Sequence, residues 1–318
     1  PPPAASAPPP ANPWAANPWA ANPWAAFMPS MAGSPWAGAF NPAGAFNATG
    51  GSAASGSPPP PRESTSAEQP LLSLRPEGDK PPLYIVHAIY GSVFPYHQLA
   101  RRLQPGRPVY GLRARGLDDG KEPRTSIAEM ATAYAAAVSA AHPGGPIHLV
   151  GYSFGAWVAY AMAELLTREG QTVGLCAPMG VGAPASALAP EVGVQVETVA
   201  SSIADTVRLM RNLALSEGRE DPLGWLDQLP QSQRLLMAHN IAALRFQPPR
   251  SALPLDLVLT TEQHPFVDQD PTLGWKAVST GAIQAHKLGG NHLAMFEEPQ
   301  VGELAVLLDA LLVGRDAA

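Results

Sequence analysis

The chain has 318 residues and a net charge of −6 at pH 7, and no block of lysine or arginine stands out. This length predicts one or two domains, and the lack of a basic cluster argues against a nucleic-acid-binding protein. No apolar run reaches the ~18 residues that a membrane-spanning helix needs. Cys176 is the only cysteine, which excludes an internal disulfide and a cysteine-rich metal site and favours a reducing, cytoplasmic compartment.

Residues 1–68 have the composition of a linker. The first charged residue is Arg62, and the motif ANPWA occurs three times in succession over residues 11–25. Proline at every fifth position breaks helices and removes donors from a sheet, so we expect an extended, disordered segment. Its tryptophans leave a second interpretation open, a docking segment for a partner chain; they are Trp14, Trp19, Trp24 and Trp36.

Residues 69–318 are predicted to form one domain in which strands and helices alternate. A capping box, Ser126 with Glu129 three residues later, opens one of the helices. Such alternation is typical of a mostly parallel sheet with helices on both faces. We expect strands at 83–87, 108–112, 147–150, 173–177, 255–260 and 283–288, and helices at 96–103, 126–141, 154–168 and 301–312.

The pattern changes between about residues 191 and 249. Apolar residues recur there at helical spacing, over 196–210 and again over 235–244, and no strand signal separates the two rows. We therefore expect a helical insertion between two strands of the sheet.

The sequence Gly151-Tyr152-Ser153-Phe154-Gly155 matches the G-x-S-x-G nucleophile elbow. An apolar strand is predicted before it and a helix after it, which is the context that this turn requires. The small residues let the strand and the helix approach closely while the serine stands above the sheet. Ser153 is therefore the predicted nucleophile.

A nucleophilic serine needs a general base and donors for the oxyanion. His292 follows the last predicted strand, where this fold keeps its base; His286 and His264 are less well placed. The expected oxyanion donors are the backbone N–H groups of Phe154, which follows the nucleophile, and of Ile89, in the loop after the first predicted strand.

The region from about 83 to 312 resembles the type I thioesterase domains that terminate nonribosomal peptide and polyketide synthases. The stretches that carry the resemblance are PLYIVHAIYGSVFPYHQLARRL at 82–103, VYGLRARGL at 109–117, SIAEMATAYAAAV at 126–138, HLVGYSFGAWVAYAMA at 148–163 and LGGNHLAMFEEP at 288–299.

The resemblance implies an α/β-hydrolase fold with a helical lid, here at about 191–249. It implies no directly bound cofactor and a substrate carried on the phosphopantetheine of an upstream acyl or peptidyl carrier protein. Residue by residue, it assigns the nucleophile to Ser153, the base to His292, and the oxyanion donors to Phe154 and Ile89. The acyl-enzyme would then be released by hydrolysis or by macrocyclisation.

The third member of the triad departs from the family's pattern. The position that usually carries its acid falls on Gly180, or on Met179 if the register shifts by one, and no Asp or Glu occurs between Gly170 and Pro190. Glu262, in the turn after the strand at 255–260, is the candidate acid, with Asp268 and Asp270 just beyond. A Ser–His dyad and a domain without activity are the alternatives.

The sequence thus predicts a carrier-dependent thioesterase cut from the end of a modular synthase. Two rivals are enzymes: a stand-alone editing thioesterase, which the long N-terminal linker disfavours, and a general serine esterase, which the stretch VYGLRARGL disfavours. A rival of another class is a non-catalytic binding module, suggested by the missing acid. The apolar rows of the lid either pack on the core or line a chamber for the acyl chain.

Overall fold

The computed structural model describes residues 69–184, 231–262 and 270–316. The predictions for the linker, for the helical row at 196–210, and for His264 and Asp268 lie outside these described residues.

A seven-stranded sheet forms the centre of the domain, in the order β1-β3-β2-β4-β5-β6-β7. Strand β1 runs antiparallel to β3, and every other pairing is parallel, as predicted for an α/β-hydrolase. The strands are β1 (Leu71–Arg75), β2 (Leu83–Val86), β3 (Val109–Leu112), β4 (Ile147–Tyr152), β5 (Val173–Met179), β6 (Leu255–Thr260) and β7 (Ile283–Leu288).

The sequence reading missed β1. This strand lies at the edge of the sheet and pairs only with β3. Its residues are partly or fully exposed, so it lacks the buried apolar run that identifies the central strands.

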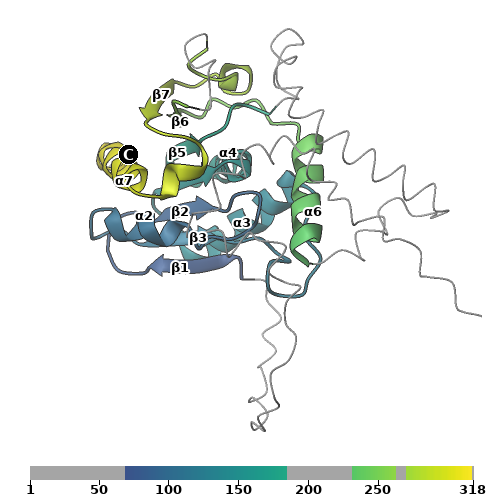
Figure 1. Ribbon diagram of the computed structural model, residues 1–318. Coiled ribbons are helices and arrows are strands. Elements are labelled where there is room, and N and C mark those ends of the chain that lie inside the picture. Colours follow the sequence, from purple (N-terminus) through teal and green to yellow (C-terminus); the bar gives the residue numbers. More distant parts are fainter. Residues whose placement is uncertain (1–68, 185–230, 263–269, 317–318) are drawn as a thin grey trace, which may run out of the picture. The chain divides into compact units, whose positions relative to one another are not determined.

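Helices cover both faces of the sheet (Figure 1). Helices α3 (Ile127–Ala141) and α4 (Phe154–Arg168) pack on one face, and α2 (Tyr96–Arg102) and α7 (Gln300–Val313) pack on the other. Helix α6 (Gln231–Arg245) confirms the second of the two apolar rows predicted in the insertion. Two short 3₁₀ helices, η7 (Trp275–Ala277) and η8 (Leu293–Phe296), flank β7 and were not predicted.

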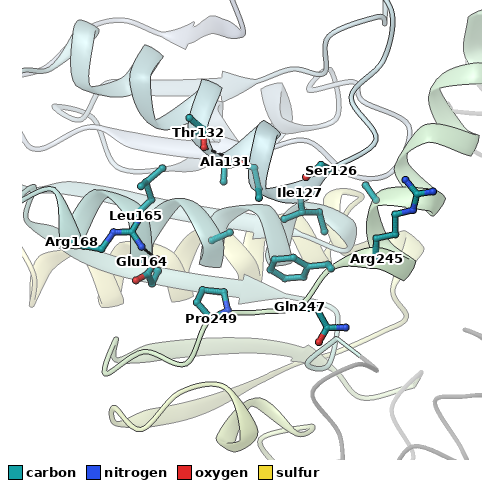
Figure 2. A pocket seen from close by; sticks show the side chains of 14 residues that line it. Ser126, Ile127, Ala131, Thr132, Glu164, Leu165, Arg168, Arg245, Gln247 and Pro249 are labelled. Atoms are coloured by element: carbon teal, nitrogen blue, oxygen red, sulfur yellow. Dashed lines mark hydrogen bonds and ion pairs between the residues drawn. The ribbon is translucent and has the colours of Figure 1, made fainter.

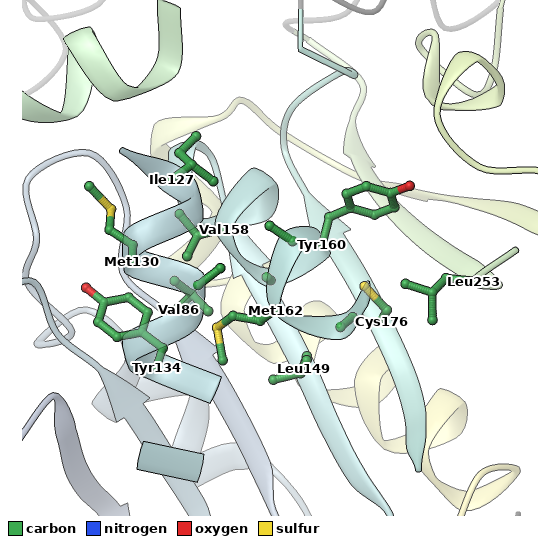
Figure 3. Close-up of a cluster of buried hydrophobic side chains, with 14 of the residues drawn as sticks. Val86, Ile127, Met130, Tyr134, Leu149, Val158, Tyr160, Met162, Cys176 and Leu253 are labelled. Atoms are coloured by element: carbon green, nitrogen blue, oxygen red, sulfur yellow. The ribbon is translucent and has the colours of Figure 1, made fainter. Parts of the chain in front are cut away.

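The two faces of the sheet bury separate apolar cores. Along β2, Tyr84 and Val86 join the core under α3 and α4, whereas Leu83 and Ile85 join the core under α2 and α7. This alternation follows from the period of two in a strand. Figure 3 shows the first core, where the side chain of Cys176 lies among apolar neighbours and is 2% exposed. None of the helices in the described ranges has the length and apolarity that crossing a bilayer requires.

Candidate active site

Ser153 stands on a strained turn between β4 and α4. Its φ is 55° and its ψ is −125°, a conformation that costs a residue with a side chain on the order of 1–3 kcal/mol. A Cβ on Gly151 would lie 2.1 Å from the Gly155 carbonyl oxygen, and a Cβ on Gly155 would lie 2.3 Å from the His87 carbonyl oxygen. Both glycines are therefore required by close backbone approach, which is the geometry predicted for the elbow.

His292 lies beside this elbow although 139 positions separate it from Ser153 in the sequence. It immediately precedes η8 and is 7% exposed. Its imidazole stacks on the ring of Tyr152, with centroids 4.7 Å apart and planes at 25°. The Ser153 N–H donates to the carbonyl of Met179, the residue before Gly180. The predicted nucleophile and base thus converge at the carboxyl ends of β4 and β5.

Gly180 occupies the position where the resemblance expects an acid. It follows β5 directly and has a φ of 70°, and its N–H donates to the Val258 carbonyl. A Cβ built there would lie 2.7 Å from Nδ1 of His292 and 3.3 Å from the ring of Tyr152. Position 180 therefore faces the imidazole of His292, the predicted base, and the space between them suits glycine.

The predicted oxyanion donors come from the loop after β2 and from the first residue of α4. Within the described ranges, the N–H groups of Ile89 and Phe154 donate to no other protein group. The Phe154 N–H also lies at the positive end of the α4 dipole. Both groups can therefore serve a substrate oxygen.

Three nearly parallel aromatic rings pack together beside the loop of Ile89. The imidazoles of His87 and His239 lie 5.0 Å apart, and both stack on Phe154, at 6.0 and 4.8 Å. His239, from α6, donates its Nδ1–H to the Ile89 carbonyl at 2.6 Å. The insertion thus fixes the peptide next to a predicted oxyanion donor, a contact that the sequence gave no means of predicting.

Burial keeps both histidines neutral. It lowers the pKa of His87 to about 4, against a partly offsetting bond to the Ala88 carbonyl, and it lowers the pKa of His239 to about 3, with His87 adding to the effect. The hydroxyl of Tyr134 donates to the second nitrogen of His87 at 2.8 Å. The two imidazoles beside the loop of Ile89 are consequently uncharged at neutral pH.

The candidate acids differ in their surroundings. Glu262 is exposed, and its backbone N–H donates to the carbonyl of Gly290, two residues before His292. Asp270 accepts hydrogen bonds from Thr272 and Gly274. Burial raises the pKa of Asp270, but these bonds outweigh it and leave the pKa below its usual value. Asp270 thus caps its own turn, whereas Glu262 adjoins the loop of the base.

His286, the other candidate base in the described residues, has a different partner. Its Nε2 lies 2.9 Å from the carboxylate of Asp256, which is 1% exposed and also pairs with Arg315 at 2.6 Å. This buried network joins β6 and β7 to the C-terminal end of α7. Among the described residues, no cluster of three or more His, Cys, Asp or Glu side chains could hold a metal.

A cavity of about 410 Å³ opens elsewhere, between α3, α4 and the end of α6 (Figure 2). Leu165 and Ile127 contribute apolar walls, and the Glu164–Arg168 ion pair lies on its rim. None of Ser153, Gly180 and His292 lines it.

Known proteins similar to this chain are synthetases and their release domains. The malpibaldin synthetase of Mortierella alpina is 30% identical over 226 residues, 71% of this chain and 4% of that protein. The nonribosomal peptide synthetase pngA of Aspergillus terreus is 40% identical over 108 residues, 34% of this chain and 11% of that protein. The chain therefore spans only a small part of the curated relatives that it matches.

The fold has solved counterparts. The thioesterase domain NocB from the nocardicin cluster is 26% identical and superposes with a TM-score of 0.55, covering 77% of this chain and 99% of NocB. The family model described as "Thioesterase domain" matches residues 81–312. With the α/β-hydrolase sheet and the serine elbow in place, the chain belongs to the thioesterase domain family.

Proposed function

We propose that this domain releases an acyl, peptidyl or polyketide chain from a carrier-protein thioester through an acyl-enzyme on Ser153. The observation that carries the proposal is the convergence of the strained Ser153 elbow with the buried imidazole of His292. Membership of the thioesterase family supports the thioester as substrate.

In the acylation step, His292 takes the proton of the Ser153 hydroxyl as Oγ attacks the thioester carbonyl. The N–H groups of Ile89 and Phe154 stabilise the resulting oxyanion. Collapse of the tetrahedral intermediate breaks the C–S bond, and the proton from His292 passes to the departing thiol. Water, or a nucleophile within the acyl chain, then attacks the ester and regenerates Ser153.

The departing thiol is that of a phosphopantetheine arm on an upstream carrier protein. This part of the proposal is supported by the synthetases among the relatives. Residues 1–68 would connect the domain to the preceding one, and the lid at about 191–249 would shape the acyl pocket. A cytoplasmic location, expected from the single cysteine, stays a prediction.

Glu262 is the proposed acid behind His292. The bond from its backbone N–H to the carbonyl of Gly290, two residues before His292, supports this choice. A Ser–His dyad is the alternative, and a test that separates the two is given in the Discussion.

The first test is covalent capture. NocB forms a covalent complex with a fluorophosphonate, so the full chain should be incubated with an acyl fluorophosphonate and with acyl-N-acetylcysteamine thioesters of several chain lengths. We expect a mass adduct that maps to Ser153, thioester turnover, and the loss of both in Ser153→Ala. A folded chain that shows neither adduct nor turnover would favour the non-catalytic module instead.

A further inference from the structure

Tyr152 connects the proposed nucleophile to the proposed base. It immediately precedes Ser153 in the elbow. Its ring stacks on the imidazole of His292, and its hydroxyl donates to the His292 carbonyl oxygen at 2.5 Å. One side chain thus contacts both the ring and the backbone of the proposed base.

The tyrosine is itself held in place. It is 9% exposed, and Phe296 of η8 meets its ring edge-on at 4.9 Å. Tyr96 also packs against Phe296, with centroids 4.9 Å apart. Because Tyr152 is packed on several sides and its hydroxyl is bonded, it presents a fixed surface to the imidazole.

Gly180 closes the remaining edge of the imidazole. The missing side chain at this position would meet both Nδ1 of His292 and the ring of Tyr152. A carboxylate at position 180 would have to displace the imidazole from its stack. An acid side chain at position 180, as the family's pattern expects, and the stacked imidazole would therefore compete for the same space.

We infer that Tyr152 is a positioning residue for His292, fixing the imidazole by stacking and its backbone by the hydroxyl bond where position 180 carries no acid. This inference rests on the proposed function. Tyr152 acts on the reaction only through His292 and does not itself exchange a proton with the substrate.

The test compares two substitutions. Tyr152→Phe keeps the stack and removes the hydroxyl bond, and Tyr152→Leu removes both. We expect kcat for thioester turnover to fall about 5-fold in the first and roughly 50-fold in the second, as losses of one and of two interactions of ordinary strength predict. KM should stay within about 2-fold, because the substrate contacts are unchanged. Fluorophosphonate labelling of Ser153 should slow in the same order.

The matched control is Tyr160→Phe. The Tyr160 hydroxyl likewise has backbone carbonyls as acceptors, with those of Pro249 and Val278 both within reach of its single hydrogen, but it lies in the other core. We expect a loss of melting temperature similar to that of Tyr152→Phe, with kcat unchanged. If Tyr152→Leu does not fold, comparing kcat in Tyr152→Phe with kcat in Tyr160→Phe tests the positioning role.

The outcomes separate the two proposals. An active wild type with unchanged kcat in the folded Tyr152 variants overturns the positioning role alone, as does an equal loss of kcat in Tyr160→Phe. A folded wild type without turnover or labelling overturns the proposed function, and the role of Tyr152 falls with it.

Discussion

His292, the proposed base, and the loop of Ile89, a proposed oxyanion donor, are both held by side chains from distant parts of the chain, but by different chemistry. His292 lies against Tyr152 and Gly180, neither of which changes charge near neutral pH. Ile89 is held by His239 of α6, which stacks with His87. The contacts around His292 depend on shape, so substitutions should disturb them. The contacts around Ile89 depend on two imidazoles that must stay neutral, so low pH should disturb them.

The largest loss of turnover is expected from substitution of Glu262, the proposed acid. If Glu262 orients His292, Glu262→Ala should lower kcat about 10²-fold or more, by analogy with other triads. Glu169→Ala is the control, since Glu169 is exposed at the far end of α4. Steady-state turnover of an acyl thioester gives the comparison. Wild-type rates in Glu262→Ala would favour a Ser–His dyad or the nearby Asp268 and Asp270.

The next effect concerns the space beside the base. Gly180→Ala should reduce kcat about 10-fold, because its Cβ would push Nδ1 of His292 out of its place. Gly120→Ala is a close control: Gly120 has a φ of 66° and no atom within 4 Å of an added Cβ. Both variants carry similar backbone strain, about 1–2 kcal/mol, so a greater loss of turnover in Gly180→Ala would report the contact with His292. Equal turnover in the two variants would contradict the close contact with His292.

The smallest effect is a change in stability with pH. His87 and His239 have a lower pKa in the folded chain than the ordinary 6.5, so the unfolded chain binds more protons between about pH 6.5 and 4. Their stabilising contribution is complete above pH 6.5 and declines as the pH falls, by up to about 1.4 kcal/mol per pH unit for each. Burial lowers the pKa of His148 to about 4 as well, with Arg107 adding to it.

Denaturant unfolding at several pH values measures this slope. We expect His239→Gln to remove its own contribution and to make stability less dependent on pH between 6.5 and 4. An unchanged slope in this variant would show that His239 is not excluded from protons in the folded chain.

The sequence predicted the parts of the site that local geometry determines. The elbow followed from the spacing of Gly151, Ser153 and Gly155, because two backbones can approach that closely only at glycine. The parallel strands followed from their buried apolar runs. The roles of Gly180 and His292 came from the resemblance, which depends on register with a known pattern, and they stay predictions.

What the sequence did not predict are contacts between elements. Nothing in the spacing of Tyr152 and His292 indicates that their rings stack. In the sequence, His239 is only one polar residue within a row of apolar residues at helical spacing. The edge strand β1 was missed because its exposed residues carry little periodic signal. Such contacts depend on how separate elements pack, and a single sequence records that only indirectly.

The buried position of Cys176 has a practical consequence. Burial in the core raises the pKa of this thiol to about 12, with Asp256 adding to the effect, and the nucleophilic form of cysteine is the thiolate. The Cys176 thiol should therefore not react with maleimide reagents while the domain is folded. A cysteine introduced at an exposed position such as Glu169 would then be the single reactive site, so a fluorophore or spin label can be attached without first replacing Cys176.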